Sequence, residues 1–501
     1  MKLFGFVLGK ILGGLFAVAS MVLLVGLWKL QMLPTTYMVL AAVIVALLVA
    51  LVIVLTWSGW GKARMTIGII LAILGIAVMS AGSFYAWKMV STLGQMSQVT
   101  ESVAMGIYMR TDDKRELDDS FRFGIWAPQD SEVDESVNSV IEKLNEDLDT
   151  TISYTKYESP MELVDALSNG KLDAIILNKA LWELWSEEEA FGEAFHEKMN
   201  AIHEVRQQVV VIVVPEEPEE PEEDPPEYTP MKDSFAVYIS GIDARSGGVG
   251  VKTRSDVNII AVVNPETKQV LLVSTPRDYY VPISSPTSYW NGKEDKLTHA
   301  GLGGPEYSKK TLSNLYGIDI AYYFKVNFSG FVEIVNALDG ITVHSDFNFQ
   351  STADDGTVYY YQKGENKLNG YAALAFCRNR YSFKDGDRQR GKHQMEVIKA
   401  VIDKALSPKL LTNYTQILDA VSDSMEMTVP MEVIGDLVSQ QLAEGGSWNV
   451  VSFDVDGVGF SAPSPAAGGA VAYMMKPDMA TVEKAKQLIK DVIDGKTVTL
   501  N

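Results

Sequence analysis

Hydrophobic and polar residues follow a membrane-type pattern in the first 100 positions of the chain. Three mostly apolar runs of 18 or more uncharged residues are separated by single or paired basic side chains. A helix of about 20 apolar residues crosses the hydrocarbon core of a bilayer. The pattern therefore predicts three transmembrane helices, at residues 11–28, 37–57 and 65–87, within a membrane anchor spanning residues 1–95.

The flanks of these runs indicate their orientation. Tryptophans, whose amphipathic rings favour the membrane interface, end each run. Four basic residues flank one side of the predicted membrane and two flank the other: Lys2, Lys10, Lys62 and Arg64 against Lys29 and Lys88. The positive-inside rule then places the N-terminus in the cytoplasm and the chain beyond residue 90 outside. The alternative for the first run is a cleaved signal peptide ending near Ala19.

The runs contain no acidic residue, which favours an anchor over a transporter or pump. We therefore expect a multi-pass protein of the cell membrane that contacts membrane lipid and carries its C-terminal domains on the extracytoplasmic side.

Residues 96–214 alternate between short apolar runs and amphipathic segments. The pattern predicts strands at 121–127, 151–157 and 174–177 and helices at 133–148, 160–168 and 180–199, which together indicate a small α/β accessory domain. We identify no catalytic motif in it. Residues 215–232 follow as a linker; positions 215–230 hold eight acids and six prolines and cannot bury apolar surface.

Residues 233–501 contain longer apolar runs that stay continuous instead of alternating. Such runs are typical of strands in a sheet covered on both faces. The pattern predicts an αβα sandwich, so the fold class of the chain is α/β. Predicted strands lie at 235–239, 257–263, 270–274, 321–326, 341–344 and 448–453. Predicted helices lie at 308–316, 331–338, 368–375, 391–405, 413–424, 431–441 and 480–493.

Charge is distributed unevenly over these regions. The 501 residues have a net charge of -21, and residues 101–230 hold 33 acidic against 10 basic side chains. Nucleic-acid binding depends on clustered basic residues and is not expected of a chain with this balance. A single cysteine, Cys377, excludes an internal disulfide framework and a multi-cysteine zinc site.

Residues 378–394 hold the densest group of basic side chains. In an extended segment Arg378 and Arg380 would point to the same face and could grip phosphate oxygens. If a helix begins near Asp387, then Asp387, Arg390 and Gln394 share a face of that helix. The alternative is a charged helix face paired in solvent.

Further charged residues stand at predicted strand ends, where open α/β sheets place their ligands. Asp243 follows the first strand, Asp256 precedes the second, and Arg277 and Asp278 follow the third. Carboxylates together with substrate phosphates are typical ligands of magnesium. Taken singly, each of these side chains is more often a turn or surface residue than part of a site.

These motifs resemble the LytR-CpsA-Psr family of Gram-positive bacteria. The resemblance rests on YISGIDAR (238–245), TRSDVNIIAVVNPETKQVLLVSTPRD (253–278), DKLTHAGLGG (295–304), YYFKVNFSGFVEIVNALDGITV (322–343) and LNGYAALAFCRNRYSFKDGDRQRGKHQ (368–394). The membrane helices and the accessory domain further resemble the capsule-associated CpsA branch. We therefore expect residues 233–501 to form a LytR-CpsA-Psr phosphotransferase domain.

The resemblance implies a transferase for cell wall or capsule biogenesis that uses magnesium. It would move a glycopolymer, with capsular polysaccharide favoured over teichoic acid, from polyprenyl pyrophosphate onto peptidoglycan and release polyprenyl phosphate. The implied roles are catalytic for Arg378, Arg380, Asp387 and Arg390, substrate binding for Arg277, Lys296 and Gln394, and magnesium binding for Asp243 and Asp256. Asp387 is the implied base, with Asp278 as second choice, and the helices after Gly391 are expected to wall a prenyl pocket.

Two other functions fit the same motifs. A binding module would hold the lipid-linked polymer or regulate its synthesis without turnover, and a hydrolase would pass the polymer to water. The remaining candidate side chains have structural interpretations. We expect Cys377 to be a buried, apolar-like residue, and His393 and His299 to lie on helix surfaces.

Overall fold

The computed structural model describes most of the chain. The described residues are 2–30, 33–57, 61–96, 100–127, 135–147, 149, 151–187, 199–210, 233–243, 250–285, 290–353, 356–380, 382–383, 386–405 and 425–500. The predicted linker at 215–232 and the predicted helix at 413–424 lie outside the described residues.

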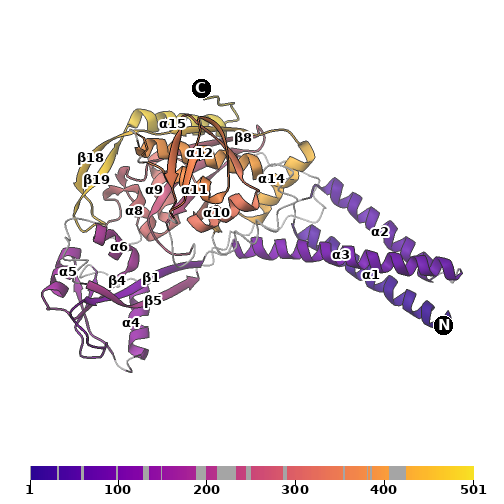
Figure 1. Ribbon diagram of the computed structural model, residues 1–501, viewed down its shortest axis with the longest axis horizontal. Coiled ribbons are helices and arrows are strands. Elements are labelled where there is room, and N and C mark those ends of the chain that lie inside the picture. The colour runs from indigo at the N-terminus through magenta and orange to yellow at the C-terminus, as the bar shows by residue number, and fades with distance from the viewer. Residues whose placement is uncertain are drawn as a thin grey trace.

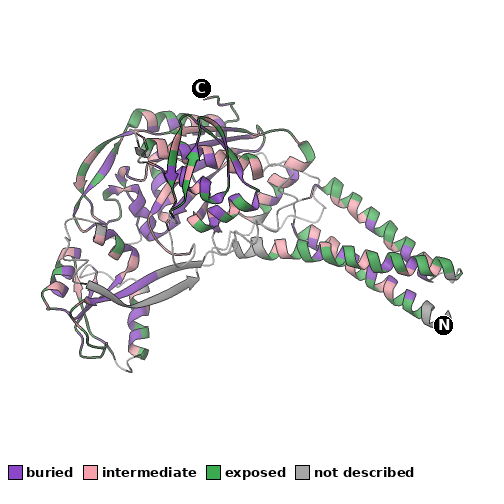
Figure 2. Ribbon diagram, viewed as in Figure 1, coloured by how far each residue is buried: buried purple, intermediate pink, exposed green. Residues whose placement is uncertain are grey.

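Three long helices at the N-terminus project from the rest of the molecule (Figure 1). They are α1 (Lys2–Leu30), α2 (Thr35–Trp57) and α3 (Lys62–Met96), and all three are long and apolar enough to cross a membrane. Large apolar side chains such as Met21, Leu47 and Val78 are about two-thirds exposed on them, and Figure 2 shows this exposed surface in green. Such a surface suits contact with lipid tails. The three predicted spans are therefore found as helices, and each helix is longer than the span predicted for it.

A five-stranded sheet with three helices follows. Its elements are β1 (Thr100–Arg110), β2 (Phe123–Trp126), α4 (Glu135–Asp147), β3 (Tyr154–Tyr157), α5 (Pro160–Ser168), β4 (Ala174–Asn178), α6 (Lys179–Glu187) and β5 (Met199–Val210). The strand order is β3-β2-β4-β1-β5. The sheet is mixed: β1 is antiparallel to β4 and β5, whereas β2 is parallel to β3 and β4.

Two strands of this sheet were not predicted. β1 was not recognised, and the predicted helix at 180–199 is wrong at its end, because β5 begins at Met199. β1 and β5 pair with one another from Thr100 opposite Val210 to Arg110 opposite Met199. The partners are about 100 positions apart, so the pairing that stabilises each strand is absent from its local sequence.

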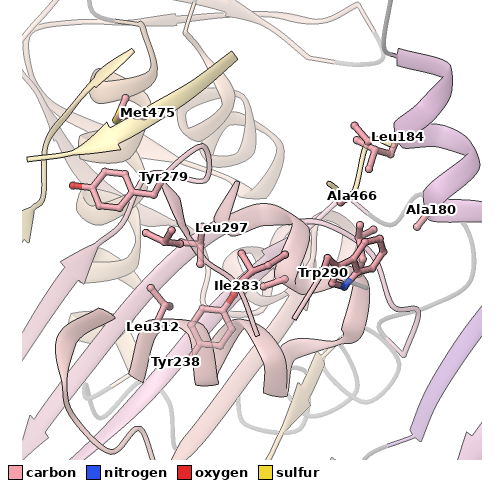
Figure 3. Packing of buried hydrophobic residues seen from close by; sticks show 14 of the residues in the cluster. Ala180, Leu184, Tyr238, Tyr279, Ile283, Trp290, Leu297, Leu312, Ala466 and Met475 are labelled. Atoms are coloured by element: carbon pink, nitrogen blue, oxygen red, sulfur yellow. The ribbon is translucent and has the colours of Figure 1, made fainter. Parts of the chain in front are cut away.

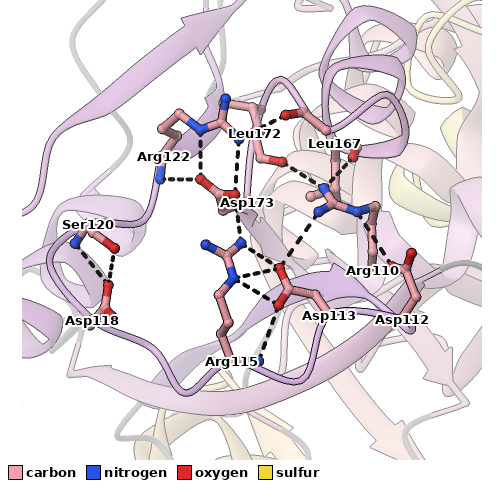
Figure 4. Close-up of polar contacts among 11 residues, drawn as sticks. Arg110, Asp112, Asp113, Arg115, Asp118, Ser120, Arg122, Leu167, Leu172 and Asp173 are labelled. Carbon is pink, nitrogen blue, oxygen red and sulfur yellow. Dashed lines mark hydrogen bonds and ion pairs between the residues drawn. The ribbon is translucent and has the colours of Figure 1, made fainter.

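An ionic cluster fixes the turn between β1 and β2 (Figure 4). Asp173 accepts hydrogen bonds from Arg122 and Arg115 at 2.7 Å each, and Arg115 also binds Asp113. Hydrogen bonds from the Arg122 and Arg115 guanidinium groups hold the pKa of Asp173 well below its usual range, despite the opposing effect of burial. Part of the acidity of this domain therefore has a structural use.

The C-terminal half is built on a six-stranded mixed sheet of order β16-β11-β6-β7-β8-β17. Its strands are β6 (Phe235–Ile242), β7 (Ser255–Asn264), β8 (Gln269–Ser274), β11 (Tyr322–Asn327), β16 (Met425–Met427) and β17 (Asn449–Asp454). On one face pack α9 (Pro305–Tyr316) and α15 (Met479–Ile493). On the other pack α10 (Phe328–Ala337), α11 (Gly370–Arg378), α12 (Gly386–Ala405) and α14 (Met431–Glu444). The predicted αβα sandwich is confirmed.

Smaller elements surround this sandwich. The hairpins are β9 (Tyr280–Pro282) with β10 (Glu294–Lys296), β12 (Ile341–Ser345) with β15 (Gly364–Leu368), β13 (Phe349–Thr352) with β14 (Val358–Tyr361), and β18 (Gly457–Pro463) with β19 (Val471–Pro477). The short α8 (Leu297–Ala300) and a 3₁₀ turn, η2 (Gly301–Gly303), follow β10.

The accessory domain shares a hydrophobic core with the sandwich domain. Figure 3 shows Ala180 and Leu184 of α6 on the same side as Ala466 and Trp290 of the larger domain. Trp185 is fully buried there, and its indole Nε1 donates a hydrogen bond to the Ala466 carbonyl at 3.0 Å. A buried aromatic anchor with a satisfied polar atom fixes how the two domains sit together.

Candidate active site

A cavity of about 830 Å³ lies between the six-stranded sheet and helices α10, α11 and α12. Charged and polar side chains line one end: Asp243, Arg254, Asp256, Arg277, Arg378, Arg380, Arg390 and Gln394. Apolar side chains line the remainder, including Val237, Ile239, Phe324, Ile334, Val401 and Ile402. The cavity is therefore amphiphilic: arginines and carboxylates line one end, and apolar side chains line the rest.

Seven of the nine predicted site residues line this cavity. Only Lys296 and Asp387 are not among the described lining residues. Asp387 lies in the first turn of α12, but its side chain is outside the described residues. Arg254 also lines the cavity and was not predicted as a site residue. The sequence could have indicated Arg254, because it stands two positions before Asp256 and alternate side chains of an extended segment share a face.

The ends of β6 and β7 bring the two predicted magnesium-binding aspartates to one place. The β6–β7 register shifts between Gly241 and Ile242, a bulge that redirects the side chains that follow. Gly241 has no room for a side chain, because a Cβ there would lie 2.8 Å from Val257 Cγ2. Asp243 and Asp256 consequently face the same cavity from adjacent strands.

A buried polar network supports this strand end from the opposite face of the sheet. Ser255 Oγ lies 2.8 Å from both Ser240 Oγ and Tyr238 Oη, and Asn258 Nδ2 donates to the Ser255 carbonyl at 3.1 Å. All four residues are buried. The residue that precedes Asp256 is thereby fixed, and Asp256 in turn accepts a hydrogen bond from Arg277 Nη1 at 2.7 Å.

The arginines of the 378–394 motif come from helices α11 and α12 and from the segment between them. Arg378 is the last residue of α11, so the expectation of an extended segment there is wrong; its guanidinium lies 4.7 Å from the centre of the Phe328 ring. The chain leaves the helix at Asn379, whose side-chain amide donates to the Gln350 carbonyl at 2.9 Å. Arg380 still reaches the cavity.

Helix α12 begins at Gly386, which satisfies the condition of a helix start near Asp387 and extends the predicted helix 391–405 toward the N-terminus. Arg390 and Gln394, one helical turn apart, both line the cavity. The same end of the cavity is therefore lined by five arginines and two aspartates: Arg254, Arg277, Arg378, Arg380, Arg390, Asp243 and Asp256. Guanidinium groups bind phosphate oxygens through parallel hydrogen bonds, so this end suits a multiply charged phosphate group.

The DKLTHAGLGG segment supports the site from behind. Asp295 and His299 are buried, with His299 Nδ1 2.9 Å from Asp295 Oδ1, and Ser464 Oγ donates to the same carboxylate at 2.8 Å. Gly301 packs under the backbone that precedes Asp256: a Cβ there would lie 2.7 Å from the Thr253 carbonyl oxygen. The surface position expected for His299 is wrong, and this segment positions the strand that carries Arg254 and Asp256.

His393 is also buried, at 2% exposure, which corrects the expected surface position. Its ring stacks on Phe349 with centroids 5.1 Å apart, and Nδ1 donates to the Phe376 carbonyl at 3.2 Å. Burial lowers the pKa of His393 to about 4, so the ring is neutral near pH 7. Cys377 is buried as predicted, and burial raises the pKa of its thiol to about 12.

The donor set at the polar end fits a hard divalent cation only with help from a substrate. Among the described residues, no three His, Cys, Asp or Glu side chains are close enough to hold a metal ion. Asp243 and Asp256 nevertheless present carboxylates to the same cavity as the arginines. Magnesium commonly takes one or two carboxylates and completes its shell with phosphate oxygens and water, so the two aspartates fit that mode of binding.

Comparison with known proteins relates the part of the chain that contains this cavity to one protein family. The model of the LytR_cpsA_psr family matches residues 200–487. The polyisoprenyl-teichoic acid–peptidoglycan teichoic acid transferase TagU of Enterococcus faecalis is 39% identical over 196 residues, which are 39% of this chain and 61% of that protein. The TagT transferase of Bacillus subtilis is 38% identical over 213 residues, 41% of this chain and 63% of that protein.

This chain thus spans less than two thirds of the length of those two relatives. Among solved structures, B. subtilis TagV is 28% identical with a TM-score of 0.43, and the alignment covers 54% of this chain and 100% of the TagV chain. The matched part of the present chain contains the whole cavity and excludes the three N-terminal helices.

Proposed function

The chain belongs to the LytR-CpsA-Psr family, and from this premise we propose that it is a membrane-anchored glycopolymer transferase. Its donor is a glycopolymer on a polyprenyl-pyrophosphate carrier, and its acceptor is a sugar hydroxyl of peptidoglycan. The observation that carries the proposal is the amphiphilic cavity. A pyrophosphate fits the arginine-lined end, and a prenyl tail fits the apolar remainder.

In the proposed reaction the acceptor hydroxyl attacks the phosphorus that bears the glycan. A new oxygen–phosphorus bond forms, the bond to the bridging oxygen of the pyrophosphate breaks, and polyprenyl phosphate leaves. Arg277, Arg378, Arg380 and Arg390 neutralise the negative charge that passes to the leaving phosphate. The hydroxyl proton passes to a carboxylate, for which Asp387 is the proposed base by its place in the arginine motif.

We propose magnesium as the cofactor, held by Asp243 and Asp256 together with phosphate oxygens of the donor. A bound magnesium ion would supply further neutralisation of phosphate charge. The aspartates themselves orient the polar end: Asp256 holds Arg277 through the 2.7 Å hydrogen bond, so that its guanidinium has a fixed direction before the donor binds.

The polymer is proposed to be a wall glycopolymer of the teichoic acid type. The two relatives compared above are named for teichoic acid, and the expected preference for capsular polysaccharide draws no support from them. The three apolar helices supply the membrane attachment that a lipid-linked donor requires, with the catalytic domain proposed to lie on the extracytoplasmic side.

The decisive experiment compares two arginines on the same helix. Arg390 lines the cavity, whereas Arg388, two residues earlier, binds Asp456 at 2.7 Å and is not among the described lining residues. We expect Arg390→Ala to reduce transfer at least 100-fold, because it removes charge from the phosphate site, and Arg388→Ala to stay within about threefold of wild type.

The measurement is release of polyprenyl phosphate by the full chain in nanodiscs, with a lipid-pyrophosphate donor, magnesium and peptidoglycan fragments. Equal activity of the two variants would contradict the proposed site. Release of polyprenyl phosphate without a covalent adduct on the fragments would identify a hydrolase, and binding of intact donor without release would identify a binding module.

A further inference from the structure

We propose that the ends of α1 and α3 that meet the catalytic domain form the membrane-side wall of its lipid cavity. On this view the prenyl tail passes from the bilayer into the cavity along these helices, beside strand β16. The inference rests on the proposed function, since it concerns the tail of the same lipid-linked donor.

The first observation is a hydrophobic cluster, here termed the junction cluster, that joins the membrane helices to the sandwich domain. Its buried members are Leu30 at the end of α1, Ala86 of α3, and Met425 and Met427 of β16. Met89 and Val90 of α3 pack against it. The membrane helices therefore contact the catalytic domain directly, in addition to their covalent link through the accessory domain (Figure 1).

Second, the junction cluster and the cavity share side chains. Phe324 of β11 and Ile334 of α10 pack against the cluster, and the same two residues line the cavity. Phe324 stands opposite Met427 in the β11–β16 ladder. Phe324 and Ile334 therefore line the cavity on one side and pack against the junction cluster on the other.

Third, strand β16 is held so that its methionines face this junction. Glu426, which stands between the two methionines in the sequence, is buried and forms a 3.4 Å ion pair with Lys325. Tyr323 donates a hydrogen bond to the same carboxylate. Because side chains alternate along a strand, Met425 and Met427 point to the opposite face, toward the cluster. Methionine side chains are flexible and adapt to the shape of an apolar ligand, which suits a wall that a lipid tail must pass.

The energetics of a prenyl tail favour a continuous apolar path. Each CH₂ group left in water costs about 0.8 kcal/mol, so a tail that crossed an aqueous gap between bilayer and cavity would bind poorly. The junction cluster closes that gap with apolar side chains. The family match begins at residue 200, so α1 and α3, which form the proposed wall, lie outside the matched part of the chain.

The test uses the unmodified full chain in nanodiscs. A polyprenyl pyrophosphate with a diazirine in its tail is irradiated on the protein, and adducts are mapped by mass spectrometry. We expect adducts in α12 near Val401, which lines the cavity, and also at Met89 or Met425 in the junction. Unlabelled polyprenyl pyrophosphate should abolish both sets. Adducts near Leu47 of α2, which is 65% exposed, serve as the background from bulk lipid and should not be competed.

The outcomes separate this inference from the proposed function. Competed adducts in α12 together with none in the junction would overturn the membrane-side wall and leave the transferase proposal intact. The absence of competed adducts in α12 would contradict the lipid cavity itself, and with it the proposed function.

A variant gives an independent readout. Ile334→Trp fills the shared wall and should raise the dissociation constant of a full-length prenyl donor about tenfold, while a donor with a two-isoprene tail binds as to wild type. The matched control is Ile493→Trp on α15, where Ile493 is 45% exposed; it should change neither constant. Equal weakening of both donors by Ile334→Trp would overturn the inference, because it would place the effect at the pyrophosphate end.

Discussion

His393 links the packing of the sandwich domain to the charged end of its cavity. It lies on α12 between Arg390 and Gln394, yet its ring is buried among Phe349, Phe376 and Phe383. Only Nδ1 has a hydrogen-bond partner among the described residues, the Phe376 carbonyl, and Nε2 is buried without one. Protonation would place a charge in this aromatic cluster.

This burial predicts acid sensitivity. The pKa of His393 is about 4 in the folded protein, against 6.5 ordinarily, so between these values the unfolded chain binds more protons and stability falls as pH falls. At pH 5 the loss relative to pH 7.5 should be about 2 kcal/mol. His393→Phe should abolish that part of the loss, as measured by urea unfolding of the full chain at both pH values. The same pH dependence in variant and wild type would contradict the assignment.

At the level of single residues, the sequence identified most of the site and missed what supports it. Arg277, Arg378 and Arg390 could be predicted because Arg277 follows a predicted strand and the other two belong to the dense basic motif at 378–394. The buried positions of His299 and His393 could not, because part of what surrounds each ring, such as Ser464 and Phe349, comes from distant parts of the chain. Lys296 is not among the described lining residues of the cavity, and its role in substrate binding stays a prediction.

Among the elements, α12 accounts for the amphiphilic cavity most directly. Its first turns supply Arg390 and Gln394, and its last turns supply Val401 and Ile402, so one helix spans both the polar end and the apolar length. The segment from Leu297 to Gly304 has the complementary task of holding the backbone before Asp256. Two glycine substitutions distinguish these tasks.

Gly301→Ala should destabilise the protein by roughly 1–3 kcal/mol, since its Cβ would meet the Thr253 carbonyl at 2.7 Å and the Ser255 nitrogen at 2.8 Å. Gly391→Ala should stabilise by about 0.5–1 kcal/mol, because its Cβ finds only ordinary contacts and alanine favours a helix. Thermal unfolding of the full chain measures both. A shift in the same direction for both variants would show that crowding behind Asp256 is not the cause.

Elements were predicted best where their pattern is local. The three membrane helices and the strands β6, β7 and β8 follow from uninterrupted apolar runs. The hairpin β18–β19 was missed because much of its apolar surface is exposed, with Val458 at 72% and Val471 at 65%, so no buried face sets its pattern. Strands β1 and β5 depend on one another across the whole accessory domain.

On the scale of the whole molecule, Trp185 connects the accessory domain to the sandwich domain. Trp185→Ala should destabilise this contact by about 3–5 kcal/mol, because it empties a fully buried site. Hydrogen exchange should then increase in α6 and around Ala466 but not in the central strands. Trp185→Phe, which retains most of the apolar volume and loses the hydrogen bond to Ala466, should show a smaller increase. Unchanged exchange in both variants would show that Trp185 does not hold the domains together.

The pairing of Thr100 with Val210 has a consequence for how this chain is assembled. The accessory domain begins and ends at neighbouring positions of one antiparallel ladder, while α3 already rests on the catalytic domain through the junction cluster. Domains whose termini lie close together tolerate insertion into, and removal from, a host. The accessory domain therefore has the end geometry of an inserted unit, and a replacement would have to supply both the same spacing of ends and the core contact that Trp185 makes with Ala466.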